Sequence, residues 1–459
     1  MQRIFAVSLL FLGCCLGVLS PPNAATAQQS ISIQQAQALL QHLVQEGQLK
    51  DARDLTKALL EATPDNLFLL LSLAKIEKAM GNHQGVIAPA KKAHHIASKK
   101  PEKFYAAMSV AEAHAELGRF TASQLWLRRA QQHAPSKALK NKAIRDFRFV
   151  RVNNPLSFDL RFSVRPSDNV NNGTTSKGFY RTVFGQELFF ATPTSSKPLH
   201  GTEISYGATA TWRPHWSEKR PIAFSLDFDA RNVVLGSDAK DVDPDVDASK
   251  FTFQQLTLGA TYDVLKAQRT EVTAGLSFGR NWYGSEHLTD VTRATLSASH
   301  VIGRGNIAGV NLRYSDQIRQ DSGARSSTGV TVSAYYSWLL PNNGRITLNG
   351  SYGSTDADSA DYAYDQKSVR VSFTPANPIL GASARFSVGY SSKDFARPLY
   401  IASPRSDQTV SLDASFAFNA ISYFGFAPVV SLSTRSTTSN VARFKTEEIG
   451  ISLGLKSAF

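Results

Sequence analysis

The last stretch of the chain alternates between apolar residues and small or polar residues with a period of two. From Ile449 onward, every second residue belongs to the series Ile449, Ile451, Leu453, Leu455, Ser457 and Phe459. This alternation predicts a β-strand with one face in an apolar medium and the other against polar surroundings. A strand of a soluble sandwich shows the same alternation, so the last strand alone leaves both interpretations open.

From Phe158 onward the same period of two occurs in fourteen segments, the last one included, of which the sixth, near Thr289–Val301, is weak. An even number of strands of about ten residues, with aromatic residues near their ends, is typical of a transmembrane antiparallel barrel. A soluble propeller or sandwich would expose too many outward aromatic residues. Long connections alternate with tight turns such as Asn419-Ala420; the long ones are 167–200, 232–250, 316–326, 354–362 and 392–406. We therefore predict a barrel of about 14 strands over residues 154–459, with long loops facing outward and short turns in the periplasm.

An aliphatic, alternating last strand that ends in an aromatic residue resembles the C-terminal signal of Gram-negative outer-membrane barrels. The barrel assembly machinery recognises that signal when it inserts a barrel. The resemblance assigns the signal to Leu453, Leu455 and Phe459. It implies that this chain is inserted into the outer membrane by the same machinery.

Residues 28–153 follow a helical spacing instead. Ser32-Ile33-Gln34-Gln35 predicts a capping box that opens the first helix. Gly47, Gly81 and Gly118 end successive helices, and Pro64 and Pro135 each follow a second helix. Glycines about 34 residues apart, with proline past the second helix, resemble degenerate tetratricopeptide repeats. We predict three helical hairpins whose concave groove binds a peptide; the alternative is a module that plugs or braces the barrel.

The N-terminus predicts export. An apolar run from Ile4 to Leu19 precedes Ala25-Thr26-Ala27, which indicates a signal peptide over residues 1–27. The only cysteines, Cys14 and Cys15, lie inside it. The mature chain is therefore expected to have no disulfide, thiolate metal site or cysteine nucleophile.

The formal net charge is +13, and residues 30–153 hold 19 Lys and Arg against 10 Asp and Glu. In an exported protein this surplus predicts acidic partners or lipid headgroups rather than nucleic acid. Lys142, Arg145, Arg148 and Arg151 fall three residues apart and predict a basic stripe on a helix over residues 137–150. The stripe either contacts anionic headgroups or the barrel rim, or is a solvated face.

Few residues suggest catalysis. Gly450-Ile451-Ser452-Leu453-Gly454 formally matches a hydrolase nucleophile elbow but lies inside a predicted strand, without the required strand–turn–helix context. The pair His94-His95 lacks metal-ligand spacing, and the histidines are interpreted as surface residues. We expect neither enzymatic activity nor a cofactor. Charges of both signs at inward positions suit a water-filled lumen or cross-strand pairing; they are Asp159, Arg161, Arg165, Asp227, Asp229, Arg231, Arg313, Arg370, Arg385 and Asp413.

Two short motifs flank the longest connection. Arg165-Pro166-Ser167-Asp168-Asn169-Val170-Asn171-Asn172 follows the first predicted strand, and Pro198-Leu199-His200-Gly201 precedes the second. With the helical repeats and the barrel, they resemble the surface lipoprotein assembly modifier (Slam) family. That family has a Ser-Pro-x-x-Asn-Ile-Asn-like segment and a Pro-Leu-x-Gly segment at these places. The chain departs from the pattern where Arg165 precedes Pro166, Val170 replaces Ile and Gly173 replaces Ala.

The resemblance implies an outer-membrane translocon that moves client proteins to the cell surface. Its clients would be surface lipoproteins or small secreted haem- or metal-capturing proteins. The helical repeats would receive the client in the periplasm, and the barrel, expected as a monomer, would pass it without nucleotide hydrolysis. The main alternative is a passive pore, either a solute porin or an exporter of anionic polysaccharide.

The two motifs are also the candidate gate of the barrel. We expect the loop that they bound to fold over or into the lumen, because its aromatic residues argue against disorder; the alternative is an ordinary exposed loop. Gly173 is expected to relieve a positive backbone φ in the turn. The candidate gate residues are Pro166, Ser167, Asp168, Asn169, Asn171, Asn172, Pro198, Leu199 and Gly201.

Overall fold

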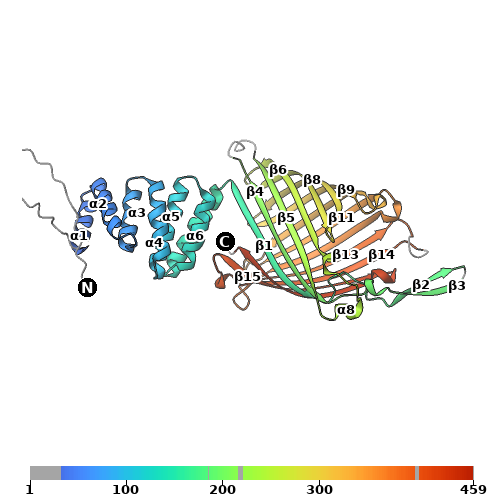
Figure 1. Ribbon diagram of the computed structural model, residues 1–459. Helices are drawn as coiled ribbons and strands as arrows, with labels where there is room; N and C mark the ends of the chain where they lie inside the picture. Colours follow the sequence, from blue (N-terminus) through green and yellow to red (C-terminus); the bar gives the residue numbers. More distant parts are fainter. Residues whose placement is uncertain (1–32, 185, 215–220, 399–402, 458–459) are drawn as a thin grey trace, which may run out of the picture. The chain divides into compact units, whose positions relative to one another are not determined.

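The computed structural model describes residues 33–184, 186–214, 221–398 and 403–457. These residues form two compact units that divide in the sequence between Asn154 and Pro155 (Figure 1). The predicted signal peptide, Ser32 of the predicted capping box and Phe459 lie outside the described residues.

The first unit is helical, as the sequence predicts. Its seven helices between residues 33 and 154 are α1 (Ile33–Gln45), α2 (Leu49–Ala62), α3 (Leu67–Ala79), α4 (His83–Ile96), α5 (Lys100–Glu116), α6 (Phe120–His133) and α7 (Lys137–Asn153). Among the residues that the structure describes, no helix is long and apolar enough to cross a membrane.

Glycine sets the turn inside each helical hairpin. Gly47, Gly81 and Gly118 adopt φ values of 74°, 72° and 70°, which only glycine adopts without a steric cost. The residue after each glycine donates its N–H to a carbonyl five residues earlier, at 2.8 to 2.9 Å, as in a Schellman motif. The predicted three hairpins, α1/α2, α3/α4 and α5/α6, are therefore confirmed, and α7 follows them.

Small residues allow these helices to pack closely. Ala90 in α4 and Ala107 in α5 are fully buried, and Phe104 and Val110 of α5 fill the space between neighbouring helices. Helix α5 begins at Lys100. Pro101 lies in its first turn, where the missing N–H of proline costs no hydrogen bond.

The second unit is a closed barrel, and the predicted strand number is confirmed. Among the described residues, fourteen antiparallel strands close the sheet in the order β1-β16-β15-β14-β13-β12-β11-β10-β9-β8-β7-β6-β5-β4. They are β1 (Leu156–Ser167), β4 (Gly201–Trp212), β5 (Ile222–Leu235), β6 (Phe253–Lys266), β7 (Thr270–Tyr283), β8 (Glu286–Ile302), β9 (Asn306–Arg319), β10 (Ser327–Leu339), β11 (Arg345–Ala357), β12 (Tyr364–Thr374), β13 (Ser383–Phe395), β14 (Ser406–Ala417), β15 (Phe426–Ser439) and β16 (Thr446–Ser457).

The alternation along the strands separates an apolar exterior from a polar lumen. Val388, Leu412 and Leu453 are about half exposed on the outer face, where a membrane protein meets lipid. The weak sixth segment is β8, the longest strand at 17 residues. Its outward positions around Leu296 include Thr292 and Ala294, and these small residues weaken the apolar period without preventing the strand.

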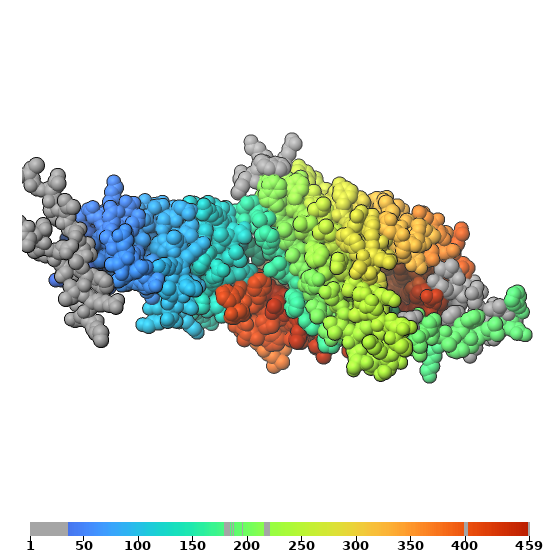
Figure 2. Space-filling view, viewed as in Figure 1, coloured from blue at the N-terminus to red at the C-terminus, as the bar shows by residue number. Residues whose placement is uncertain are grey.

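The sequence did not predict one element of the longest connection. Within residues 167–200, β2 (Gly178–Val183) pairs with β3 (Gln186–Ala191) in a separate two-stranded hairpin. The hairpin extends beyond the barrel end at which β1 finishes (Figure 1) and, in green, projects from the surface of the barrel unit (Figure 2). Phe189 and Phe190 are exposed on it.

Candidate functional site

The two sequence motifs lie directly against each other. The Val170 N–H donates to the Leu199 carbonyl at 3.0 Å. The Asn171 side chain spans the same gap: its Nδ2 donates to the Lys197 carbonyl at 2.7 Å, and its Oδ1 accepts from the Leu199 N–H at 3.0 Å. The beginning and the end of a connection of about thirty residues are therefore held together before β4 starts.

Asn169 closes the turn between them. Its Oδ1 accepts from the Gly173 N–H at 2.6 Å, its Nδ2 donates to the Gly173 carbonyl at 2.9 Å, and its own N–H donates to Ser167 Oγ at 3.1 Å. The expected role of Gly173 is wrong, since the positive φ of 53° belongs to Asn172. Gly173 is needed for space, because a Cβ there would stand 2.4 Å from the Lys197 carbonyl group.

Apolar residues of the motifs anchor the turn to the wall of the barrel. Val170 and Leu199 are buried with Val233 of β5 and Ala239 of the short helix α8 (Ala239–Val242). A Cβ on Gly201 would stand 2.7 Å from the Val234 carbonyl oxygen, so the first residue of β4 must be small. The buried apolar residues of both motifs therefore anchor the loop to the wall of the barrel.

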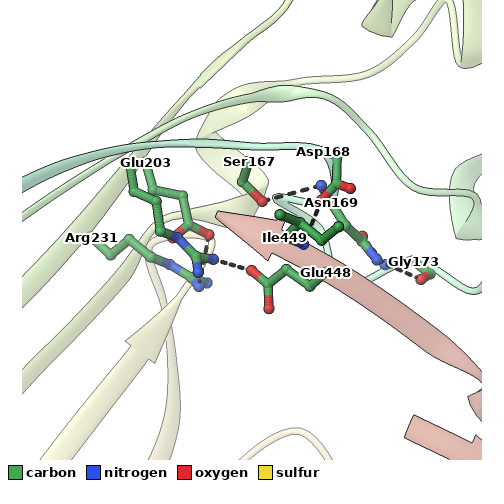
Figure 3. A network of polar contacts seen from close by, with 9 residues as sticks. Ser167, Asp168, Asn169, Gly173, Glu203, Arg231, Glu448 and Ile449 are labelled. Atoms are coloured by element: carbon green, nitrogen blue, oxygen red, sulfur yellow. Dashed lines mark hydrogen bonds and ion pairs between the residues drawn. The ribbon is translucent and has the colours of Figure 1, made fainter. Parts of the chain in front are cut away.

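A network of charges lies beside the turn (Figure 3). Arg165 of β1 donates through Nε to Glu203 of β4 at 3.2 Å and pairs through Nη2 with Glu448 of β16. Arg231 of β5 reaches the other oxygen of Glu203 at 3.4 Å. The Glu203 side chain is only 8% exposed, so its charge depends on these two arginines.

The motif also contacts the last strand. The Asp168 carboxylate accepts from the Ile449 N–H at 3.4 Å (Figure 3). Sequence reasoning predicted Arg165 and Arg231 as inward residues but did not single out Glu203 or Glu448. Both glutamates occupy inward positions of their strands, so the alternation was the signal that could have found them.

Several other inward charges pair across strands. Arg161 of β1 contacts Asp227 and Asp229 of β5, each at 2.9 Å. Arg370 of β12 pairs with Asp413 of β14 at 2.8 Å. The inward charges were expected to line a water-filled lumen or to pair across strands. These ion pairs agree with both interpretations, because opposite charges neutralise each other inside a polar lumen.

Two cavities open inside the lumen, and Asn172 lines both. One, of about 680 Å³, is bounded by the charge network and by Asn169 to Asn172. The other, of about 590 Å³, is bounded by β11 to β15 and the segment before β16. Ser411 and Arg435 also line both. The first part of the connection thus lines the lumen, whereas its aromatic part, on which the expected gate was argued, forms the separate β2–β3 hairpin.

The predicted basic stripe lies on α7, and all four of its residues are exposed or half-exposed. They do not share one face, because three residues turn an α-helix about 300° and the series winds through about 180°. Lys142 pairs with Asp146 at 2.6 Å at one end. At the other end Arg151 lies near Arg128, and burial together with this second charge lowers the pKa of Arg128 to about 10.

The histidine pair differs from its expected surface position. His95 is exposed, but the His94 ring is half-buried against the edge of Trp126, with centroids 5.3 Å apart. Burial, helped by the neighbouring His133 and Lys103, lowers the pKa of His94 to about 4. No group of three metal-ligating side chains is arranged to hold a metal ion in the part of the chain that the structure describes.

A closed barrel with an apolar exterior and a charged lumen, preceded by helical repeats, defines an outer-membrane β-barrel protein with an added repeat unit. The family comparison agrees with this class. The chain belongs to the surface lipoprotein assembly modifier family, whose model matches residues 157–459. The resemblance drawn from the two motifs is thus confirmed.

Solved structures resemble the two units separately. PcrH from Pseudomonas aeruginosa is 18% identical, covers 28% of this chain and 98% of that chain, and has a TM-score of 0.25. A BenF-like porin from Pseudomonas fluorescens Pf-5 is 8% identical, covers 66% and 98%, and has a TM-score of 0.37. A loop-deletion mutant of OmpT from Vibrio cholerae is 9% identical, covers 66% and 99%, and has a TM-score of 0.33. A comparison with curated protein sequences gave no match.

Proposed function

We propose that this chain is an outer-membrane translocon that delivers client proteins from the periplasm to the cell surface. The clients are surface lipoproteins or small secreted haem- or metal-binding proteins. The observation that carries the proposal is the family match over the whole barrel, from residue 157 to residue 459. The polar lumen, into which the first connection reaches, supports it.

The helical unit is assigned to the periplasm, where it receives the client. Helices α3 and α5 offer a face for a polypeptide, because Phe68 and Tyr105 are exposed on them although both are large aromatic residues. Lys78 and Glu112 join the two helices across this face at 2.6 Å. Stacked helical hairpins leave such surfaces open for peptides.

The barrel passes the client without chemistry of its own. We assign it no enzymatic activity and no cofactor, and we assign its insertion to the barrel assembly machinery. Acting as a monomer, it provides a lumen of paired charges and hydroxyl groups, along which a polypeptide exchanges hydrogen bonds with water and side chains. Nucleotide hydrolysis has no part in this scheme.

A second candidate is a pore for an anionic polysaccharide, and the cavity of about 590 Å³ favours it, because five of its lining residues are Lys or Arg. The test compares the full chain with a truncated chain that begins at Pro155 behind the signal peptide. Each is co-expressed with a lipoprotein client, and surface display is measured by protease accessibility on intact cells at matched barrel levels.

The translocon proposal expects display with the full chain and far less with the truncated chain. Equal display by both would reduce the helical unit to a brace. If neither chain displays any client while both admit an acidic polysaccharide into liposomes, the polysaccharide pore replaces the translocon.

A further inference from the structure

One cavity of the lumen is lined mainly by positive charge. The cavity of about 590 Å³ is lined by a single acid, Asp407, and by five basic residues: Arg370, Lys393, Arg405, Arg435 and Arg443. The larger cavity is balanced instead, with three arginines against Glu203, Asp413 and Glu448. The two cavities therefore differ in charge although they share Asn172, Ser411 and Arg435.

The single acid already has a partner. Asp407 pairs with Arg405, whose guanidinium also lies 3.3 Å from the Phe444 ring centroid and 4.4 Å from that of Phe395. Lys393 lies 3.5 Å from the centroid of the Tyr364 ring. Aromatic faces stabilise a cation without neutralising it. The basic residues that line the cavity therefore outnumber its single acid, which is already paired.

Two of the cations have no ion-pair partner among the described residues: Lys393 and Arg435. The cross-strand neighbours of Arg435 are Ser411 and Glu448, and the Glu448 carboxylate already pairs with Arg165. Inside a lumen, where the local dielectric is below that of bulk water, an unpaired cation attracts anions strongly.

We propose that this cavity is a docking site for the carboxylates of an acidic, extended segment of the client polypeptide. The inference rests on the proposed function and names the chemistry of the segment that the lumen holds. Arginine binds carboxylate through two parallel hydrogen bonds, and lysine supplies a point charge. Hydroxyl groups of Thr409, Thr437 and Thr446 line the same cavity and suit the backbone amides between the acidic side chains.

Arg435 places the docking site next to the turn of the first connection. Because Arg435 and Asn172 line both cavities, a segment bound at Arg435 lies against the turn of the first connection. An acidic polysaccharide offers the same carboxylates. The membership of the chain in a lipoprotein assembly family favours a polypeptide.

The test uses the purified full chain in detergent. The probes are a fluorescent oligoglutamate, an oligoglutamine of equal length and a polyuronate, and binding is followed by fluorescence anisotropy at two salt concentrations. The variant is Lys393→Gln combined with Arg435→Gln. The matched control is Arg313→Gln, which removes an inward cation of β9 that lines neither cavity. Heat-modifiable migration on gels confirms that every variant is folded.

The expected result is salt-sensitive binding of oligoglutamate over oligoglutamine, weakened about tenfold or more by the double variant and less than about twofold by the control. Equal binding by the wild type and the double variant would overturn the site. Tighter binding of the polyuronate than of oligoglutamate would overturn the polypeptide assignment.

Surface display separates this inference from the proposed function. A double variant that loses oligoglutamate binding yet displays clients like the wild type overturns the docking role and leaves the translocon intact. A wild-type chain that displays no client overturns the proposed function, whatever its affinity for oligoglutamate.

Discussion

Arg165 in the first strand of the barrel forms an ion pair with Glu448 in the last strand, across the seam where the sheet closes. Backbone pairing is sparse there: β1 and β16 share four registered pairs in the described residues, whereas β1 and β4 share twelve. Pro166 has no N–H to donate to a ladder. Side chains therefore supply part of the closure that backbone hydrogen bonds supply between the other strands.

The first prediction concerns the substitution Arg165→Gln at this seam. The substitution removes one partner of Glu203 and the only ion pair of Glu448 in the described residues, so we expect a loss of stability of about 1–3 kcal/mol. Heat-modifiable migration on gels measures it as a lower melting temperature. Arg280→Gln is the control, since it breaks an ion pair with Asp290 between β7 and β8, which share fourteen registered pairs. A control that melts as early as Arg165→Gln would contradict a special role for the seam.

Two asparagines of the first connection differ in their contacts: Asn171 bridges the two motifs, whereas Asn172 is the one that lines both cavities. Asn171→Ala removes both side-chain bonds that join the two motifs and leaves the Val170–Leu199 backbone bond, so we expect faster proteolysis within residues 168–200 and a loss of about 1–3 kcal/mol. Asn172→Gly keeps the positive φ but removes the side chain that lines both cavities. We expect that variant to melt like the wild type and to export less client. Normal client export by Asn172→Gly, at matched barrel levels, would mark the turn as structural only.

The architecture could be predicted because its signals repeat. The barrel was predicted from an alternation that repeats in fourteen strands, and the helical unit from glycine turns that repeat in three hairpins. One weak strand such as β8 therefore did not change the predicted architecture. The two motifs were found through their resemblance to segments of the surface lipoprotein assembly modifier family, and the Asn and Asp residues of the first also predicted a turn.

The details of the site could not be predicted, because they depend on contacts between distant segments. Position 173 requires glycine because the backbone of Lys197, 24 residues away, lies close to it. The sequence around Gly173 gives no sign of this contact. The pairing of Arg165 with Glu448 requires closure of the barrel. The burial of His94 requires Trp126 from another hairpin, so spacing alone made it a surface residue.

Burial of His94 predicts acid sensitivity of the helical unit. The folded pKa is about 4 and the ordinary value is 6.5, so above pH 6.5 the ring is neutral in both states. As the pH falls from 6.5 to 4, the unfolded chain binds a proton that the folded chain does not, and stability is lost. We expect a loss of about 1–2 kcal/mol after solvent screening of a part-buried ring.

Urea unfolding of the helical unit, residues 28–154, at pH 7.5 and pH 4.5 measures this loss. His94→Phe keeps a ring against Trp126 and should remove much of the difference between the two pH values. His95→Gln, at the exposed neighbour, should keep the difference. An unchanged pH dependence in His94→Phe would assign the effect to other groups.

The last prediction concerns assembly and uses the two faces of β16. Leu453 and Leu455 are 60% and 47% exposed on the outer face, where lipid covers them. Replacing both with Asp puts charge into the membrane, at a cost per residue below the roughly 2–4 kcal/mol of a mid-membrane Lys or Arg. Ser452→Asp adds one such carboxylate to the same strand on its lumen side, where water accepts it. We expect the double variant and deletion of Phe459 to lower the barrel yield in isolated outer membranes, and Ser452→Asp to leave it unchanged. If Ser452→Asp lowers the yield as much, the strand tolerates no charge on either face and the outward signal is not the cause.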